Sequence, residues 1–142
     1  MKFNKKAGLK YLGLILLAAL VGCATTNNAD SGQDAFVREV VRETNRHIRL
    51  PMMIADGLRW DSTRAERGGR MVHTYTLVNH TAAEIDAVAF VAEMRPVIIA
   101  NLRANAAVMQ PLLDNRVTIV YVYRDRNRRE ITRIELTYQE YR

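Results

Sequence analysis

The sequence contains one cysteine and has no lysine after residue 10. A lone cysteine excludes an internal disulfide and a zinc cage built from cysteines. All four lysines lie in the first ten residues, so much of the net charge of +6 belongs to that segment. From residue 23 onward, 17 arginines stand against 15 acidic residues, a formal charge of +2. This part of the chain is nearly balanced, and no nucleic-acid partner is expected.

Long apolar runs are also scarce, and the longest is an almost continuous one at residues 9–21. It follows the lysine-rich start of the chain, which is the layout of a secretory signal peptide. The run is shorter than the ~20 apolar residues that a membrane-spanning helix needs. It ends in the tetrapeptide Leu20-Val21-Gly22-Cys23.

This tetrapeptide resembles the lipobox of bacterial lipoproteins. The resemblance implies that a signal peptide, residues 1–22, is cleaved between Gly22 and Cys23. It further implies that Cys23 is diacylated on its sulfur and that the new N-terminus is acylated, which anchors the protein in a membrane. Ala24 stands where an aspartate would resemble an inner-membrane retention signal. The expected location is the inner leaflet of the outer membrane, facing the periplasm. The alternative to a lipobox is an uncleaved N-terminal anchor with an incidental cysteine.

The remaining sequence predicts a tether followed by one domain. Residues 23–33 comprise the lipidated cysteine and a small, polar, flexible tether. Residues 34–142 are long enough for a single small α+β domain. We expect an α-β-β-α-β-β two-layer sandwich with an antiparallel sheet and helices packed on one face. The expected elements are a helix at 34–46, a strand within 52–60 that bends or bulges at Gly57, a loop or hairpin connection at 61–69, and a strand at 70–79. A helix behind a capping box at 81–84 should kink or break near Arg95 and stop before Pro111, and Asp114-Asn115 should then turn the chain into strands at 116–124 and 130–141.

Short motifs in the predicted domain are similar to those of a group of small, uncharacterised bacterial envelope proteins. They are the Pro-led segment Leu50-Pro51-Met52, the strand Tyr75-Thr76-Leu77 and the hairpin Tyr121-Val122-Tyr123-Arg124-Asp125. Many members have a glycine in that hairpin loop and a cysteine pair, whereas this chain has Asn127 and no pair. The resemblance implies a fold and a compartment, and it implies no reaction.

Residues that could carry catalysis are few. An acylated Cys23 cannot act as a nucleophile, because that role needs a free thiolate. The three histidines, His47, His73 and His80, match no metal-ligand spacing, so we expect structural roles for them and neither a metal nor a cofactor. Asp56 and Asp61 flank Trp60, which is the layout of acid and aromatic side chains in sugar-binding clefts. The alternative is that Trp60 packs at the end of a strand, with the two acids at loop edges.

The most unusual local feature is a cluster of arginines at an expected hairpin tip: Arg124, Arg126, Arg128 and Arg129. Planar guanidinium groups bind phosphates and carboxylates well, so this tip is a candidate contact for an anion or a partner. The alternative is a solvated loop whose charges discourage aggregation.

These observations favour a non-enzymatic, lipid-anchored envelope protein with a binding or accessory and assembly role. A secretion, conjugation-exclusion or immunity context would fit such a protein. Its expected partners are the membrane, through the acyl chains on Cys23, and an envelope protein or peptidoglycan. The alternative function is a module that binds or hydrolyses peptidoglycan, built around Asp56, Trp60 and Asp61.

Overall fold

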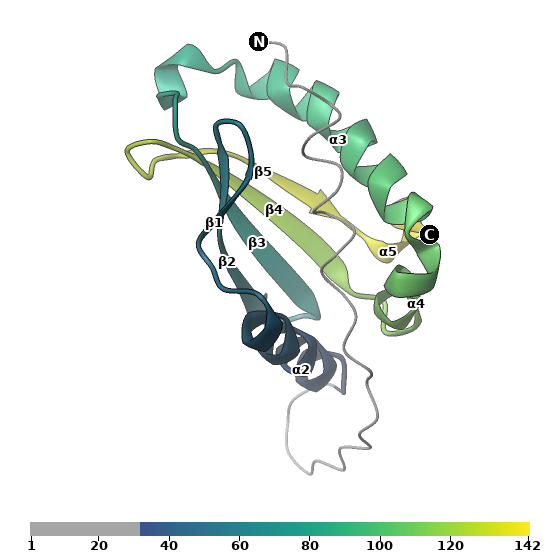
Figure 1. Cartoon of the computed structure of the whole chain (residues 1–142). Helices are drawn as coiled ribbons and strands as arrows, with labels where there is room; N and C mark the ends of the chain where they lie inside the picture. Colours follow the sequence, from purple (N-terminus) through teal and green to yellow (C-terminus); the bar gives the residue numbers. More distant parts are fainter. Residues whose placement is uncertain (1–31) are drawn as a thin grey trace.

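The computed structural model describes residues 32–142 (Figure 1). The predicted signal peptide, the cleavage site, Cys23 and nearly all of the tether lie outside the described residues. No described helix combines the length and the apolar composition needed to cross a membrane. The elements follow one another in this order: α2 (Gly32–His47), β1 (Met52–Ala55), β2 (Leu58–Glu66), β3 (Arg70–Leu77), the 3-10 turn η1 (Ala82–Glu84), α3 (Ala87–Ala104), α4 (Ala106–Asp114), β4 (Thr118–Asp125), β5 (Glu130–Leu136) and α5 (Tyr138–Tyr141).

The strands form one five-stranded sheet in the order β1-β2-β3-β4-β5. The α+β class is confirmed, but the sheet is mixed, because β3 and β4 are parallel while the other neighbours are antiparallel. The chain leaves the end of β3, passes through α3 and α4, and re-enters the sheet at the opposite end. A helical crossover of this kind joins parallel strands, which the expectation of a wholly antiparallel sheet overlooked.

The predicted strand at 52–60 is a hairpin. Gly57 forms its turn with a positive φ of 74°, and a Cβ there would lie 3.1 Å from the Asn79 side chain. The strand after this turn, β2, then continues to Glu66, through residues that we expected to form a loop. Asp61, Arg64 and Glu66 form ion pairs on the face of the sheet that no helix covers, and Thr63 is buried beside His73, so polarity there did not signal a loop.

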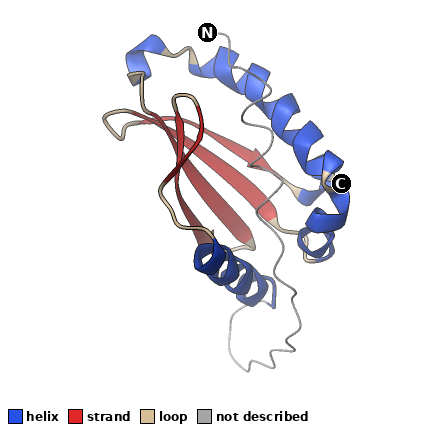
Figure 2. Cartoon of the chain, viewed as in Figure 1, coloured by secondary structure: helices blue, strands red, loops and turns tan. Residues whose placement is uncertain are grey.

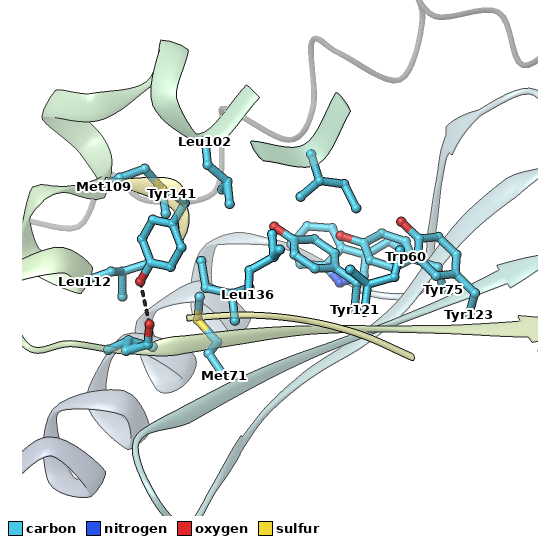
Figure 3. Close-up of a cluster of buried hydrophobic side chains, with 14 of the residues drawn as sticks. Trp60, Met71, Tyr75, Leu102, Met109, Leu112, Tyr121, Tyr123, Leu136 and Tyr141 are labelled. Atoms are coloured by element: carbon cyan, nitrogen blue, oxygen red, sulfur yellow. Dashed lines mark hydrogen bonds between the residues drawn. The ribbon is translucent and has the colours of Figure 1, made fainter. Parts of the chain in front are cut away.

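All the helices pack on one face of the sheet, as predicted (Figure 2). Figure 2 shows α2 crossing one end of the sheet and α3 running along the side of β5. Between sheet and helices lies one apolar core, which includes Val37 of α2, Ile98 of α3 and Leu112 of α4. The strands contribute mainly large side chains, among them Trp60, Met71, Tyr75, Ile119, Tyr121, Tyr123, Ile134 and Leu136 (Figure 3).

The opposite face of the sheet is covered by its own charged side chains. Its centre is a separate buried cluster of Val72, Val120 and Val122. Around this cluster lie the ion pairs Arg59–Asp61, Arg64–Glu66 and Arg70–Glu135. Long arginine and glutamate side chains can shield apolar surface with their methylene groups while their charged ends stay in water.

The crossover helices differ from the prediction at both ends. Thr81 and Glu84 form the expected capping box, but it holds only the 3-10 turn. The α3 helix begins after Asp86, whose carboxylate accepts hydrogen bonds from the amides of Val88 and Ala89 at 3.0 and 3.1 Å. The start of the long helix therefore lies about one turn later than expected.

The predicted break near Arg95 and the stop before Pro111 are wrong. The α3 helix continues through Pro96, and the interruption falls at Asn105. One proline removes a single helical hydrogen bond. Phe90, before Pro96 in the sequence, and Ile98, after it, are both buried, so both parts of the helix are held against the core. The α4 helix ends at Asp114, where the amide of Val117 donates to Leu112 O at 2.9 Å across Arg116, which has a φ of 51°. Glycine is usual at that position, which is arginine here. The turn predicted at Asp114-Asn115 is where α4 ends.

The last predicted strand, 130–141, ends at Leu136 and gives way to α5. Thr137 and Glu140 form a capping box, because Glu140 Oε2 accepts from the Thr137 amide at 2.8 Å and from its hydroxyl at 3.1 Å. This turn places Tyr141 in the core, where its hydroxyl donates to Val117 O at 2.5 Å (Figure 3). The C-terminus is thus fastened to the start of β4.

Replacing Tyr141 with phenylalanine (Tyr141→Phe) should lower the free energy of unfolding by about 1–2 kcal/mol, since the buried Val117 carbonyl loses its donor. Chemical denaturation measures this. The matched control is Tyr138→Phe, because no hydrogen bond involves the Tyr138 hydroxyl among the described residues; it should change stability by less than about 0.5 kcal/mol. Equal losses in the two variants would contradict the assigned role of Tyr141.

Candidate functional site

Of the three residues predicted to form a sugar-binding cleft, Trp60 and Asp61 lie on opposite faces of the sheet, and Asp56 is exposed in the turn between β1 and β2. Trp60 is 2% exposed, stacks on Tyr75, and donates its indole N–H to Ser62 O at 3.1 Å. Asp61 contacts groups on the opposite face of the sheet, where its carboxylate accepts hydrogen bonds from Arg59 Nε and Thr76 Oγ1, both at 2.5 Å. A buried tryptophan cannot stack on a sugar ring. The alternative is right that Trp60 packs, but wrong that it ends a strand, because β2 continues through Asp61 to Glu66.

The three histidines also lie apart. His73 is 3% exposed with Nδ1 2.8 Å from Thr63 Oγ1, and burial lowers the pKa of its imidazole to about 4. His47 is exposed on the last turn of α2, with Nδ1 2.9 Å from Glu43 O. His80 lies in the loop after β3. Among residues 32–142 no three histidine, cysteine or acidic side chains are close enough to hold a metal ion.

The arginine cluster lies where the sequence predicted it, in the hairpin between β4 and β5. The Arg128 amide donates to Asp125 O at 2.9 Å, and the Asp125 amide donates to Arg129 O at 2.8 Å. These two bonds define a three-residue loop, 126–128, whose last residue, Arg128, has a φ of 67°. A loop of this kind is one of the common hairpin connections, and glycine is the usual residue at its left-handed position.

The carboxylate of Asp125 organises this hairpin. It accepts hydrogen bonds from the amides of Asn127 and Arg129, each at 2.8 Å, and from the amide of Ala82 at 2.9 Å. Burial alone would raise the pKa of this carboxyl. The amides of Ala82, Arg129 and Asn127, together with the nearby Arg129 guanidinium, nevertheless hold that pKa below its usual value. The ionised carboxylate therefore joins the hairpin to the loop before α3.

A second bond ties the same two loops, because the Arg126 amide donates to His80 O at 2.9 Å. The backbone of the tip is consequently held from both sides, by Asp125 and by the loop that follows β3. Sequence reasoning missed the role of Asp125. An aspartate at the first position of a turn was a usable signal for the bonds within the hairpin, but nothing in the sequence indicated the bond to Ala82, 43 residues away.

The structure brings three of the four predicted arginines together. The side chains of Arg126, Arg128 and Arg129 are exposed in or beside the loop. Arg124 is half-buried and, two residues after Val122 in β4, lies on the same uncovered face of the sheet. Within the described part of the chain, none of these four guanidinium groups takes part in an ion pair. We call Arg126, Arg128 and Arg129 the arginine tip.

Replacing Asp125 with asparagine (Asp125→Asn) should loosen the arginine tip without unfolding the domain, because one amide oxygen replaces the two charged oxygens that accept three amides. Hydrogen exchange at the Asn127 and Arg129 amides should accelerate by roughly tenfold or more. The matched control is Asp114→Asn, at the end of α4, which should leave exchange at the tip unchanged. Unaltered exchange in the Asp125 variant would show that this carboxylate does not hold the loop.

Lowering the pH from about 7.5 to 4.5 should reduce the free energy of unfolding through His73. The unfolded chain takes up a proton near the ordinary pKa of 6.5, whereas the folded protein resists protonation until about 4. The contribution of His73 to the free energy of unfolding is therefore complete above pH 6.5. It is lost as the pH falls towards 4, by up to about 3 kcal/mol. Denaturation curves of wild type and His73→Gln test this, since the variant should lack this part of the slope. Parallel pH profiles would refute it.

Comparisons with known proteins concern the fold. No family model matches the sequence, and no curated protein matches it at a significant level. A candidate secreted protein from Pseudomonas aeruginosa is similar in structure, with a TM-score of 0.63, 12% identity, and coverage of 80% of this chain and 100% of that one. The type II secretion system pilotin AspS from Vibrio cholerae is similar with a TM-score of 0.55, 10% identity, and coverage of 76% and 91%. At these identities the chain shares the fold of these two proteins.

Proposed function

We propose that this chain is a lipid-anchored envelope protein with a non-catalytic accessory or assembly role, and that secretion is the context that fits it best. The observation that carries the proposal is the likeness to a secretion-system pilotin, which extends over 91% of the pilotin chain. The second structural neighbour, a candidate secreted protein, supports export from the cytoplasm. The predicted lipobox at 20–23 supports a membrane anchor on Cys23.

The described surface supports binding rather than catalysis. Its most organised polar feature is the arginine tip, in which a buried carboxylate fixes a loop and leaves three cations exposed. Arginine side chains recognise carboxylates and phosphates, and they are poor proton-transfer groups because they stay charged. The peptidoglycan alternative is disfavoured, because Trp60 is buried and the Asp61 carboxylate binds Arg59 and Thr76.

The anchor is tested by expressing the full chain and its Cys23→Ala variant in an envelope with two membranes. The wild-type protein should stay in the membrane fraction after a carbonate wash, and its N-terminal peptide should carry the mass of acyl chains on Cys23. The variant should lose the acyl mass and leave the membrane fraction, because roughly 0.8 kcal/mol per buried CH₂ group is lost with the chains.

The matched control is Ala24→Asp, which keeps Cys23 and changes the neighbouring residue only. It should remain acylated but move from the outer-membrane to the inner-membrane fraction in a density gradient. An unmodified N-terminal peptide in the wild type, or a Cys23→Ala protein that resists the carbonate wash, would overturn the lipid anchor. Affinity capture of the wild type should yield an envelope protein that the Cys23→Ala variant does not capture.

A further inference from the structure

We infer that the arginine tip is a docking surface for a carboxylate-rich region of another envelope protein, and that it faces away from the membrane that holds the anchor. The inference rests on the proposed function for the compartment and for the anchor. It adds which surface binds and what chemistry the partner offers.

The tip is rigid before any partner arrives. Its backbone is fixed by three hydrogen bonds from backbone amides to the Asp125 carboxylate. Two further hydrogen bonds run from the Arg128 amide to Asp125 O and from the Arg126 amide to His80 O. A preformed loop loses less conformational entropy on binding than a flexible one. An electrostatic attraction to a lipid surface needs no such preparation, because it depends mainly on the number of basic residues near the surface.

Arg128 is placed where its own backbone disfavours it. A left-handed φ of 67° suits glycine and strains a residue that has a Cβ. The Arg128 side chain is exposed and forms no ion pair with a described residue, and the hydrogen bonds around Asp125 hold its backbone in this conformation. Local strain of this kind is typical of functional positions, where an external contact gives the side chain its use.

The chemistry of the tip favours carboxylates held in a fixed geometry. All of its cations are arginines, in a chain that has no lysine after residue 10. The guanidinium fork binds a carboxylate through two parallel hydrogen bonds, which a lysine cannot do. Three such forks on one loop match a surface that presents several acidic side chains.

The position of the tip separates it from the predicted anchor. The chain enters the described domain at the start of α2, where Gln33 Nε2 donates to the carbonyls of Asn115 and Arg116, at 3.0 and 2.8 Å. Arg116 lies just before β4, and the tip follows the end of β4 (Figure 1). Because β4 has eight residues, the two sites lie roughly 25 Å apart along the strand. An anchor upstream of α2 is therefore joined to the domain at the end of the sheet opposite the tip.

The test compares two substitutions of the same kind. Arg128→Gly and Arg116→Gly each remove one arginine from a left-handed position, each relieve backbone strain, and each lower the net charge by one. The full chain is purified in detergent and titrated with poly-L-glutamate, with vesicles of phosphatidylethanolamine and phosphatidylglycerol, and with peptidoglycan sacculi. Thermal unfolding of both variants should occur at or above the wild-type temperature, which shows that they fold.

We expect wild type to bind poly-L-glutamate, Arg128→Gly to bind it roughly tenfold more weakly, and Arg116→Gly to bind it like wild type. Equal weakening in both variants would reduce the effect to net charge and overturn the inference. Binding to vesicles or sacculi that Arg128→Gly abolishes, without binding to poly-L-glutamate, would assign the tip to lipid or cell wall instead. These readouts do not depend on Cys23, so failure here is distinguishable from failure of the anchor.

Discussion

The Asp125 carboxylate is the interaction on which the candidate binding surface depends. It is 1% exposed and accepts three backbone amides, one of them from the loop before α3. A buried anion is stable only when donors of this kind replace its water. Asp125 therefore depends on the crossover, because the loop that donates a hydrogen bond to its carboxylate is the one that connects β3 to α3.

The two faces of the sheet divide the tasks of the domain. One face carries the core, in which Trp60, Tyr75, Tyr121 and Tyr123 lie side by side beneath the helices (Figure 3). Burial raises the pKa of Tyr75, Tyr121 and Tyr123 above the ordinary value of a tyrosine hydroxyl. On the other face, arginines pair with carboxylates, except that Arg124 has no ion pair among the described residues. Only at the β4–β5 loop do arginines gather without such pairs among the described residues.

Sequence periodicity predicted the elements whose packing is local. The helix at 32–47 follows from apolar residues such as Val37 and Val41 at helical spacing, and β3 follows from its β-branched and aromatic residues. It failed where distant contacts decide. The strand expected to reach residue 141 turns into α5 at the Thr137–Glu140 capping box, and the contact of Tyr141 with the Val117 carbonyl holds that turn in place. Likewise, Pro96 and Pro111 lie inside helices that tertiary packing holds.

The candidate site was predictable in the same measure. The arginine cluster was visible in the sequence, but its division into an exposed tip and a half-buried Arg124 follows from the end of β4 at Asp125. The role of Asp125 needed a contact across 43 residues. For Trp60, the sequence offered an acid on each side but could not show that Asp61 would lie on the opposite face. A pattern of residue types thus indicated the surface, and only the fold shows which groups share it.

The most direct measurement is in-cell photocrosslinking of the full chain with a benzophenone amino acid at Asn127, in the middle of the arginine tip. Gln110, exposed on α4, is the control position. Our expectation is that position 127 crosslinks to an acidic segment of one envelope protein, and that position 110 does not. Adducts with lipid or peptidoglycan alone, or the same adducts from both positions, would contradict it.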